Sequence, residues 1–285
     1  MKKKMSYQEL VQMKREGKKF LTAVCYDYAW ARLVDQTPIE TIFCGDSMGM
    51  NVYGYESTNP VTMEQMIVHC QAVRRGAPNT FMFGDMVYGS YEESPEQAVR
   101  NGIRLVKETG VDAVKLEGGV QFAPHVRAMT DAGIIVFGHL GVTPQSAALN
   151  DGFRAKGRDT DSARKIITDC FALYEAGIKA ILLECVPPEL SRFVSSKLPI
   201  PIFEADEHGT LLCDMFDLFP DKKPPRFAYR SKYSFGNMAI ESLNDWWRET
   251  REGTWPREEN LYRIKGDIND YIKVFDEFED VDYMQ

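Results

Sequence analysis

The chain has 285 residues, of which 44% are hydrophobic, and it carries a formal net charge of −8. This composition supports a full hydrophobic core, in one large domain or two smaller ones. No apolar run is long enough to cross a membrane, and the charged start lacks the apolar segment of a secretory signal. The six cysteines are scattered without a CxxC pair. We therefore expect a cytoplasmic protein with no membrane or nucleic-acid partner.

The charges are concentrated at the two ends of the chain. Residues 1–20 contain seven Lys or Arg against two acids, and residues 266–285 contain seven acids against one Lys. The basic start is interpreted as the solvated face of a first helix, with binding to an anionic surface as the alternative. The acidic end is interpreted as a tail that either docks on a neighbouring subunit or frays.

Eight apolar runs predict strands. In chain order they span residues 21–26, 41–44, 80–83, 113–116, 134–137, 180–183, 200–203 and 227–229. Amphipathic segments between them predict helices, among them residues 94–109, 162–176 and 187–196. The first of these helices opens with Ser94 as N-cap, Pro95 at the first helical position and Gln97 at the capping-box position.

Near-continuous apolar strands separated by helices are typical of a parallel sheet that is covered on both faces. Eight such units predict an α/β fold, a closed (β/α)8 TIM barrel. An open doubly wound sheet is the alternative, but no GxGxxG motif follows the first strand. We expect residues 1–265 to form a single barrel domain with an N-terminal helix, and residues 266–285 to form the acidic tail.

Four of the predicted strands lead into a carboxylate, namely Asp46, Asp85, Glu117 and Glu184. A buried carboxylate is costly unless it is paired, hydrogen-bonded or bound to a metal. Because the catalytic groups of a barrel lie at the C-terminal ends of its strands, these four predict one converging site. The alternative is that each carboxylate only caps the helix that follows it.

The first three carboxylates follow neighbouring strands. Asp46, Asp85 and Glu117 offer the oxygen ligands that Mg2+ or another hard divalent cation prefers. Lys115 precedes Glu117 by two residues, so strand alternation places both on one side. There Lys115 can bind an anionic substrate oxygen or merely neutralise Glu117. Ser47 can add a hydroxyl or a backbone N–H.

Glu184 and His139 follow strands on the opposite side of the predicted barrel. A carboxylate set apart from the metal in an apolar strand suits a general base, because such surroundings can raise its pKa toward the working pH. His139 is interpreted either as part of the site or as a structural histidine.

Longer runs around these residues resemble a known family. They are GDSMGM at 45–50, STNPVT at 57–62, RRGAP at 74–78, SPEQA at 94–98, VKLEGG at 114–119, GHLGVTPQS at 138–146, KGR at 156–158 and LECVP at 183–187. In this order, over about residues 6–200, they make the chain similar to the ketopantoate hydroxymethyltransferase (3-methyl-2-oxobutanoate hydroxymethyltransferase) family.

The resemblance implies a barrel of the phosphoenolpyruvate/pyruvate superfamily and a step of pantothenate biosynthesis. It implies Mg2+ around Asp46 and Asp85 with Glu117 nearby, an α-keto acid bound by Asp46, Ser47, Asp85, Lys115 and His139, and Glu184 as proton acceptor. The metal would stabilise the enolate of the keto acid, which attacks the one-carbon unit of 5,10-methylenetetrahydrofolate. Family members form homo-oligomers, often decamers, so a homo-oligomer is expected.

The chain departs from the family after the seventh strand. A glycine-rich run of the Gly-Ile-Gly-Ala-Gly type is expected there, but residues 203–209 read FEADEHG. Charged side chains in place of glycines predict a changed keto acid or a changed folate contact. A second metal at Glu204, Asp206, Glu207 and His208, or a loop without consequence, are the alternatives. Two other functions stay open: a Mg2+-dependent C–C lyase or aldolase of the same superfamily, and a non-catalytic oligomeric binding protein.

Overall fold

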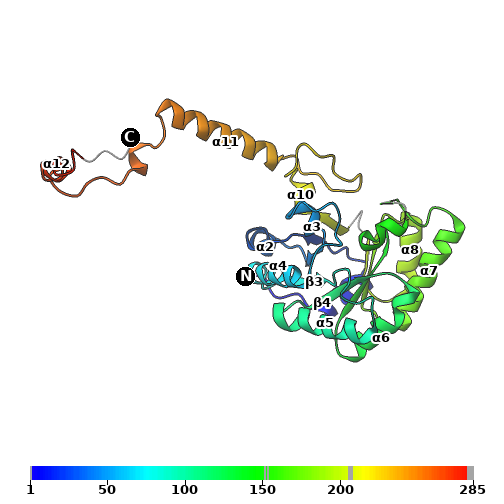
Figure 1. Ribbon diagram of the computed structural model, residues 1–285. Coiled ribbons are helices and arrows are strands. Elements are labelled where there is room, and N and C mark those ends of the chain that lie inside the picture. Colours follow the sequence, from blue (N-terminus) through cyan, green and yellow to red (C-terminus); the bar gives the residue numbers. More distant parts are fainter. Residues whose placement is uncertain (1, 151, 153, 205–207, 281–285) are drawn as a thin grey trace. The chain divides into compact units, whose positions relative to one another are not determined.

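A computed structural model describes residues 2–150, 152, 154–204 and 208–280 of the chain (Figure 1). The chain divides into two compact units, Met1–Ser234 and Phe235–Gln285. In the first unit, eight parallel strands form a nearly closed barrel with helices between them, so the predicted fold is confirmed. The boundary expected between barrel domain and tail, at residues 265 and 266, lies inside the second unit.

The strand registers place polar residues of neighbouring strands beside one another. The strands are β1 Thr22–Val24, β2 Thr41–Cys44, β3 Phe81–Asp85, β4 Ala113–Glu117, β5 Val136–Gly141, β6 Ala180–Glu184, β7 Ile202–Glu204 and β8 Gly209–Leu211, in the order β7-β6-β5-β4-β3-β2-β1-β8. Asp85 is level with Lys115, and Glu117 is level with His139. Parallel strands have their C-terminal ends at one rim of the barrel, so these side chains meet there.

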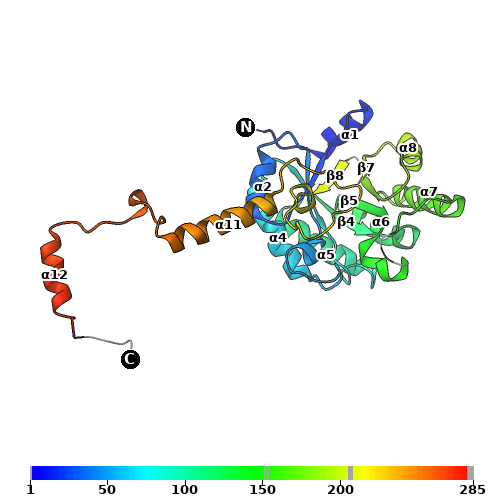
Figure 2. The same ribbon diagram turned by 90° about the horizontal axis from the view of Figure 1, so that it is seen from above.

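The helices surround the strands (Figure 2). In the first unit they are α1 Tyr7–Arg15, α2 Tyr28–Asp35, α3 Met48–Asn51, α4 Met63–Gly76, α5 Pro95–Thr109, η1 Val120–Phe122, α6 Ala123–Asp131, η2 Pro144–Asn150, α7 Thr160–Glu175, α8 Pro188–Lys197 and α10 Leu212–Met215. Ser94 caps α5 as predicted and accepts a hydrogen bond from Gln97 N at 3.1 Å. The predicted capping box is not completed, because the Gln97 side chain accepts from Glu93 N instead.

The predicted eighth strand, residues 227–229, is wrong. Besides β2, β1 pairs with β8, which starts five residues after the end of β7 and aligns Gly209 with Thr22. Its three residues are all only half-buried, so they lack the apolar run by which the other strands were predicted. Phe227 instead lines the cavity described below.

Phenylalanines fill the barrel beneath its C-terminal rim. Phe43 stacks on Phe83 at 4.6 Å between ring centroids, and Phe83 contacts Phe137 at 5.1 Å. Phe203 closes the cluster, 5.8 Å from Phe137 and 4.7 Å from Phe20. Offset and edge contacts of this kind add to the stability gained by burial. The cluster gives the site above it a rigid apolar floor.

The second unit consists of α11 Phe235–Glu252, η3 Glu258–Asn260 and α12 Ile268–Asp276. Its helices keep large apolar side chains exposed, among them Leu243, Trp246 and Trp247 on α11 and Phe275 on α12. None of the helices that the structure describes, in either unit, combines the length and hydropathy needed for crossing a bilayer.

Candidate active site

The predicted site residues converge on one cavity. Its volume is about 980 Å³, and its lining includes Asp46, Ser47, Asp85, Lys115, Glu117, His139 and Glu184. Asp85, Glu117 and Glu184 end β3, β4 and β6, and Asp46 and Ser47 follow β2. Lys115 and His139 lie inside β4 and β5, two residues before the end of each strand. The strand-end pattern in the sequence therefore corresponds to a single site in space.

Lys115 provides the buried positive charge of the site. Its Nζ lies 2.9 Å from Asp85 Oδ1, 3.3 Å from Glu117 Oε1 and 5.5 Å from the centre of the Phe43 ring. The side chain is 2% exposed, and burial opposes its charge. Asp85 and Glu117 outweigh that effect and raise the pKa of Lys115, so an ammonium group faces the cavity.

His139 joins two carboxylates. Its Nδ1 lies 3.1 Å from Glu117 Oε1, and its Nε2 lies 3.1 Å from Glu184 Oε2. Burial and the charge of Lys115 would lower the pKa of His139, but Glu117 and Glu184 raise it to about 9. The ring is therefore an imidazolium at neutral pH. Its Nδ1 also lies 3.2 Å from Lys115 Nζ, and this approach of two cations is offset because both share Glu117 Oε1.

Glu117 has both carboxylate oxygens engaged. Oε1 accepts from Lys115 and His139, and Oε2 accepts from the backbone N–H of Gln145 at 3.0 Å. Burial would raise the pKa of Glu117, but Lys115 and His139 lower it to about 2. Glu117 is therefore a carboxylate that organises the two cations, and its position as a direct metal ligand stays a prediction.

Asp46 and Asp85 form a carboxylate pair. The backbone N–H of Asp46 donates to Asp85 Oδ2 at 3.1 Å, and both side chains are at most 3% exposed. Burial raises the pKa of both groups, and the charges of Asp85 and Glu117 add to the effect on Asp46. Asp85 Oδ1 accepts no well-directed hydrogen bond, although Lys115 lies beside it. The pair thus lacks part of the positive charge that two buried carboxylates need.

A divalent cation fits this deficit. In the described part of the chain, no three His, Cys, Asp or Glu side chains are grouped as a ready-made metal centre. Mg2+, however, is usually held by only one or two carboxylates together with water and substrate oxygens. Asp46 and Asp85, which both line the cavity, match that smaller set.

Glu184 is the least buried of the four carboxylates. Its side chain is 23% exposed at the end of β6, and its backbone carbonyl accepts from Val142 N at 2.9 Å. Gly141 packs directly against that carbonyl. A Cβ atom on Gly141 would lie 2.1 Å from it, and φ is +93° there, so only glycine allows β5 and β6 to approach this closely. The backbone of Glu184 is thus held firmly, while its side chain faces the cavity.

Two residues, Tyr26 and Asn51, orient Ser47 at the cavity edge. Its Oγ lies 2.9 Å from the hydroxyl of Tyr26, and the Asn51 amide donates both to that hydroxyl and to the Ser47 carbonyl. Tyr26 and Asn51 are not among the predicted site residues, because neither residue stands out from its neighbours. No role was predicted for Gln145 and Tyr91 either, which lie within or beside the matching runs and contact Glu117.

The strands β7 and β8 contribute an apolar wall. Phe203, Gly209 and Leu211 line the cavity there. His208 is buried, stacks on Phe20 at 5.2 Å and has its Nδ1 3.0 Å from the backbone nitrogen of Glu204. Of the four residues considered for a second metal, Asp206 and Glu207 lie outside the described residues.

Sequence comparison shows long matches to one family. The family described as ketopantoate hydroxymethyltransferase matches residues 4–258. The 3-methyl-2-oxobutanoate hydroxymethyltransferase of Alkaliphilus metalliredigens is 41% identical over 284 residues, which cover 98% of this chain and 100% of that protein. The enzyme of the same name from Heliobacterium modesticaldum is 44% identical over 275 residues, covering 94% and 99%.

Comparison with solved structures shows the same barrel at low identity. A phosphonopyruvate hydrolase in complex with oxalate and Mg2+ has a TM-score of 0.54 and 13% identity, covering 99% of this chain and 100% of that one. A 2,3-dimethylmalate lyase of the PEP mutase/isocitrate lyase superfamily has a TM-score of 0.53 and 16% identity, covering 95% and 98%. At such identities the likeness concerns the fold alone.

Proposed function

This chain belongs to the ketopantoate hydroxymethyltransferase family, and we propose that it transfers a hydroxymethyl group from 5,10-methylenetetrahydrofolate to 3-methyl-2-oxobutanoate or a related α-keto acid. The observation that carries the proposal is the chain of contacts from Asp85 through Lys115, Glu117 and His139 to Glu184 in one cavity. We assign the reaction to pantothenate biosynthesis and the protein to the cytoplasm.

The keto acid would lie between the carboxylate pair of Asp46 and Asp85 and the ammonium group of Lys115. Asp46 and Asp85 would hold Mg2+, and bound Mg2+ supplies a Lewis acid that draws charge from the keto group. The Lys115 ammonium, already held by Asp85 and Glu117, is placed to bind an anionic oxygen of the substrate. The Ser47 hydroxyl, oriented by Tyr26, supplies a further hydrogen bond.

Glu184 would act as the general base. It is the one carboxylate of the four with a side chain partly exposed to the cavity. The His139 imidazolium lies 3.1 Å from Oε2 as a charge contact without a well-directed hydrogen bond. Glu184 would take the proton from C3 of the keto acid, and the electron pair left on C3 would form the bond to the one-carbon unit. Water would supply the hydroxyl oxygen of that unit, and both of its bonds to the donor nitrogens would break, so that tetrahydrofolate leaves.

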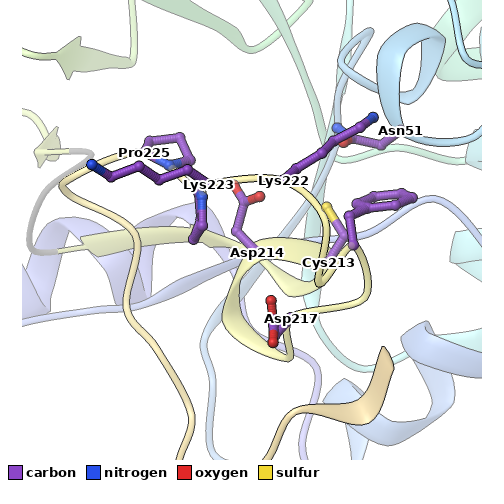
Figure 3. A pocket seen from close by; sticks show the side chains of 9 residues that line it. Asn51, Cys213, Asp214, Asp217, Lys222, Lys223 and Pro225 are labelled. Atoms are coloured by element: carbon purple, nitrogen blue, oxygen red, sulfur yellow. The ribbon is translucent and has the colours of Figure 1, made fainter. Parts of the chain in front are cut away.

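The donor would occupy the outer part of the cavity. Ligand cavities for drug-sized molecules have volumes of about 300–1,000 Å³. At about 980 Å³ the cavity is far larger than a five-carbon acid needs. Arg158 and Arg226 line it with exposed side chains. Beside it, a smaller hollow is lined by Asp214 and Asp217 together with Lys222 and Lys223 (Figure 3), and it shares Asn51, Asp214 and Pro225 with the cavity. These cations suit the carboxylates of the donor's glutamyl tail.

We expect Arg158→Gln and Arg226→Gln each to raise the KM for the folate donor by a factor of about five, since one exposed charge contact contributes up to about 1 kcal/mol. The KM for the keto acid should stay unchanged. Steady-state kinetics with methylenetetrahydrofolate and with a methylenetetrahydropteroate that lacks the glutamyl tail check this. The exposed Arg192 on α8 provides the control, Arg192→Gln. An equal loss with the tail-less donor would contradict the assignment.

The proposed reaction is tested by incubating the protein with methylenetetrahydrofolate, Mg2+ and a panel of keto acids, and by identifying products by mass spectrometry. We expect a hydroxymethylated keto acid, no product after EDTA treatment, and recovery when Mg2+ is returned. Cleavage of a keto acid without any folate-dependent product would support the lyase alternative instead. The dimethylmalate lyase likeness does not favour that alternative, because at 16% identity it concerns the fold. The relatives are named as enzymes, which removes the non-catalytic alternative.

We also propose a homo-oligomer, with a decamer as the expected form. The second unit exposes Leu243, Trp246 and Trp247 on one helix and Ile272 and Phe275 on another. Exposed apolar groups of this size are typical of protein–protein contact surfaces.

A further inference from the structure

Gln145 is a buried amide in the middle of the carboxylate site. It stands near the start of η2, after β5, and is 5% exposed. Its side chain contacts Asp46, which follows β2, and Met86, which follows β3. Its backbone contacts Glu117 at the end of β4. One residue therefore connects the ends of four neighbouring strands.

All hydrogen-bonding groups of the Gln145 side chain are used. Nε2 donates to Asp46 Oδ2 at 2.8 Å and to the Met86 carbonyl at 2.9 Å, and an amide nitrogen has only these two hydrogens. Oε1 accepts from the Tyr91 hydroxyl at 2.6 Å. A flipped amide would turn its oxygen toward two acceptors, so the orientation of the group is determined by its surroundings.

Tyr91 sets that orientation from outside the carboxylate pair. It is 1% exposed, and its hydroxyl also lies 3.2 Å from the Glu117 carbonyl. The backbone N–H of Glu117 donates to the same hydroxyl at 3.3 Å. Since a phenol has one hydrogen, the Tyr91 hydroxyl donates it to Gln145 Oε1, which is the nearer of the two acceptors. Tyr91 thus acts on Asp46 only through Gln145.

We propose that Gln145 is a positioning residue that holds Asp46 so that its second carboxylate oxygen, Oδ1, faces the cavity and can bind the divalent cation. The inference rests on the proposed function, which places that cation at Asp46 and Asp85. The bond to Oδ2 removes the rotation that would exchange the two oxygens of Asp46. The Asp46 N–H to Asp85 Oδ2 bond fixes the second carboxylate in the same way. Both ligands are therefore set before the cation arrives.

The test measures cation affinity directly, on the full chain without substrate. Free Mn2+ is titrated and detected by electron paramagnetic resonance for the wild type, Gln145→Leu, Tyr91→Phe and the double variant. Gln145→Leu is expected to weaken Mn2+ binding by about 10- to 100-fold, the usual effect of removing a partner of a metal ligand. Tyr91→Phe should weaken it less, and the double variant should match Gln145→Leu, because Tyr91 acts through Gln145.

The control is Tyr7→Phe, which removes a hydroxyl bonded to the Lys179 carbonyl and should leave Mn2+ affinity unchanged. If Gln145→Leu has a native circular dichroism spectrum and binds Mn2+ with wild-type affinity, this inference is overturned while the proposed function stands. If Gln145→Leu does not fold, Tyr91→Phe decides, and wild-type affinity in that variant would also overturn it. A wild type that binds no Mn2+ would overturn the metal site of the proposed function together with this inference.

Discussion

The Glu184→Gln variant is expected to lose about a hundredfold to ten-thousandfold in turnover, the usual contribution of general acid–base catalysis. Glutamine has nearly the same size and its amide oxygen can still face His139, so the fold and the binding of the keto acid should persist. The amide has no basicity, however, and cannot take the C3 proton. The direct measurement is deuterium exchange at C3 of the keto acid, followed by NMR in the presence of Mg2+ and without any donor.

The matched control is Glu189→Gln, the same change five residues on at an exposed position of α8. It should exchange the C3 hydrogen at the wild-type rate. Continued exchange at that rate by Glu184→Gln would show that another group is the base. Because exchange needs no folate, this outcome is independent of whether the donor is identified correctly.

The second large effect is expected from Lys115→Met. Methionine fills a similar space but leaves Asp85 and Glu117 without the ammonium that lies 2.9 Å and 3.3 Å from them. Removing one partner of a buried ion pair typically lowers the free energy of unfolding by about 3–5 kcal/mol. In protein freed of metal by EDTA, we expect the free energy of unfolding to fall by this amount and the binding of the keto acid to be lost. Added Mg2+ should restore part of the stability, since it supplies positive charge to the same carboxylates.

Urea unfolding at one protein concentration, with EDTA and then with Mg2+, measures this effect. Lys3→Met is the control, because it breaks a pair with Glu9 in which both side chains are exposed, and such pairs contribute about 0–1 kcal/mol. Similar losses in the two variants would mean that Lys115 is not the central counter-ion of the site.

The strand-end carboxylates were predictable because their signal is local. An apolar run specifies a buried strand, and a charged residue at its end needs a partner. In a parallel barrel all strand ends lie at one rim, so the fold class alone brings Asp46, Asp85, Glu117 and Glu184 together. The eighth strand was not predictable in this way, because the three residues of β8 are half-buried and carry no apolar run.

The sequence by itself determined the barrel, the rim on which the chemistry lies and the residues that reach it from strands. Only the tertiary structure decided which of those residues form hydrogen bonds and ion pairs with one another. It engages both oxygens of Glu117 with Lys115, His139 and Gln145, and so leaves Asp46 and Asp85 as the carboxylates in need of a cation. The contact between Gln145 and Asp46 spans 99 residues of sequence. No periodicity encodes such a contact, because it depends on a loop after β5 folding back over the ends of β2 to β4.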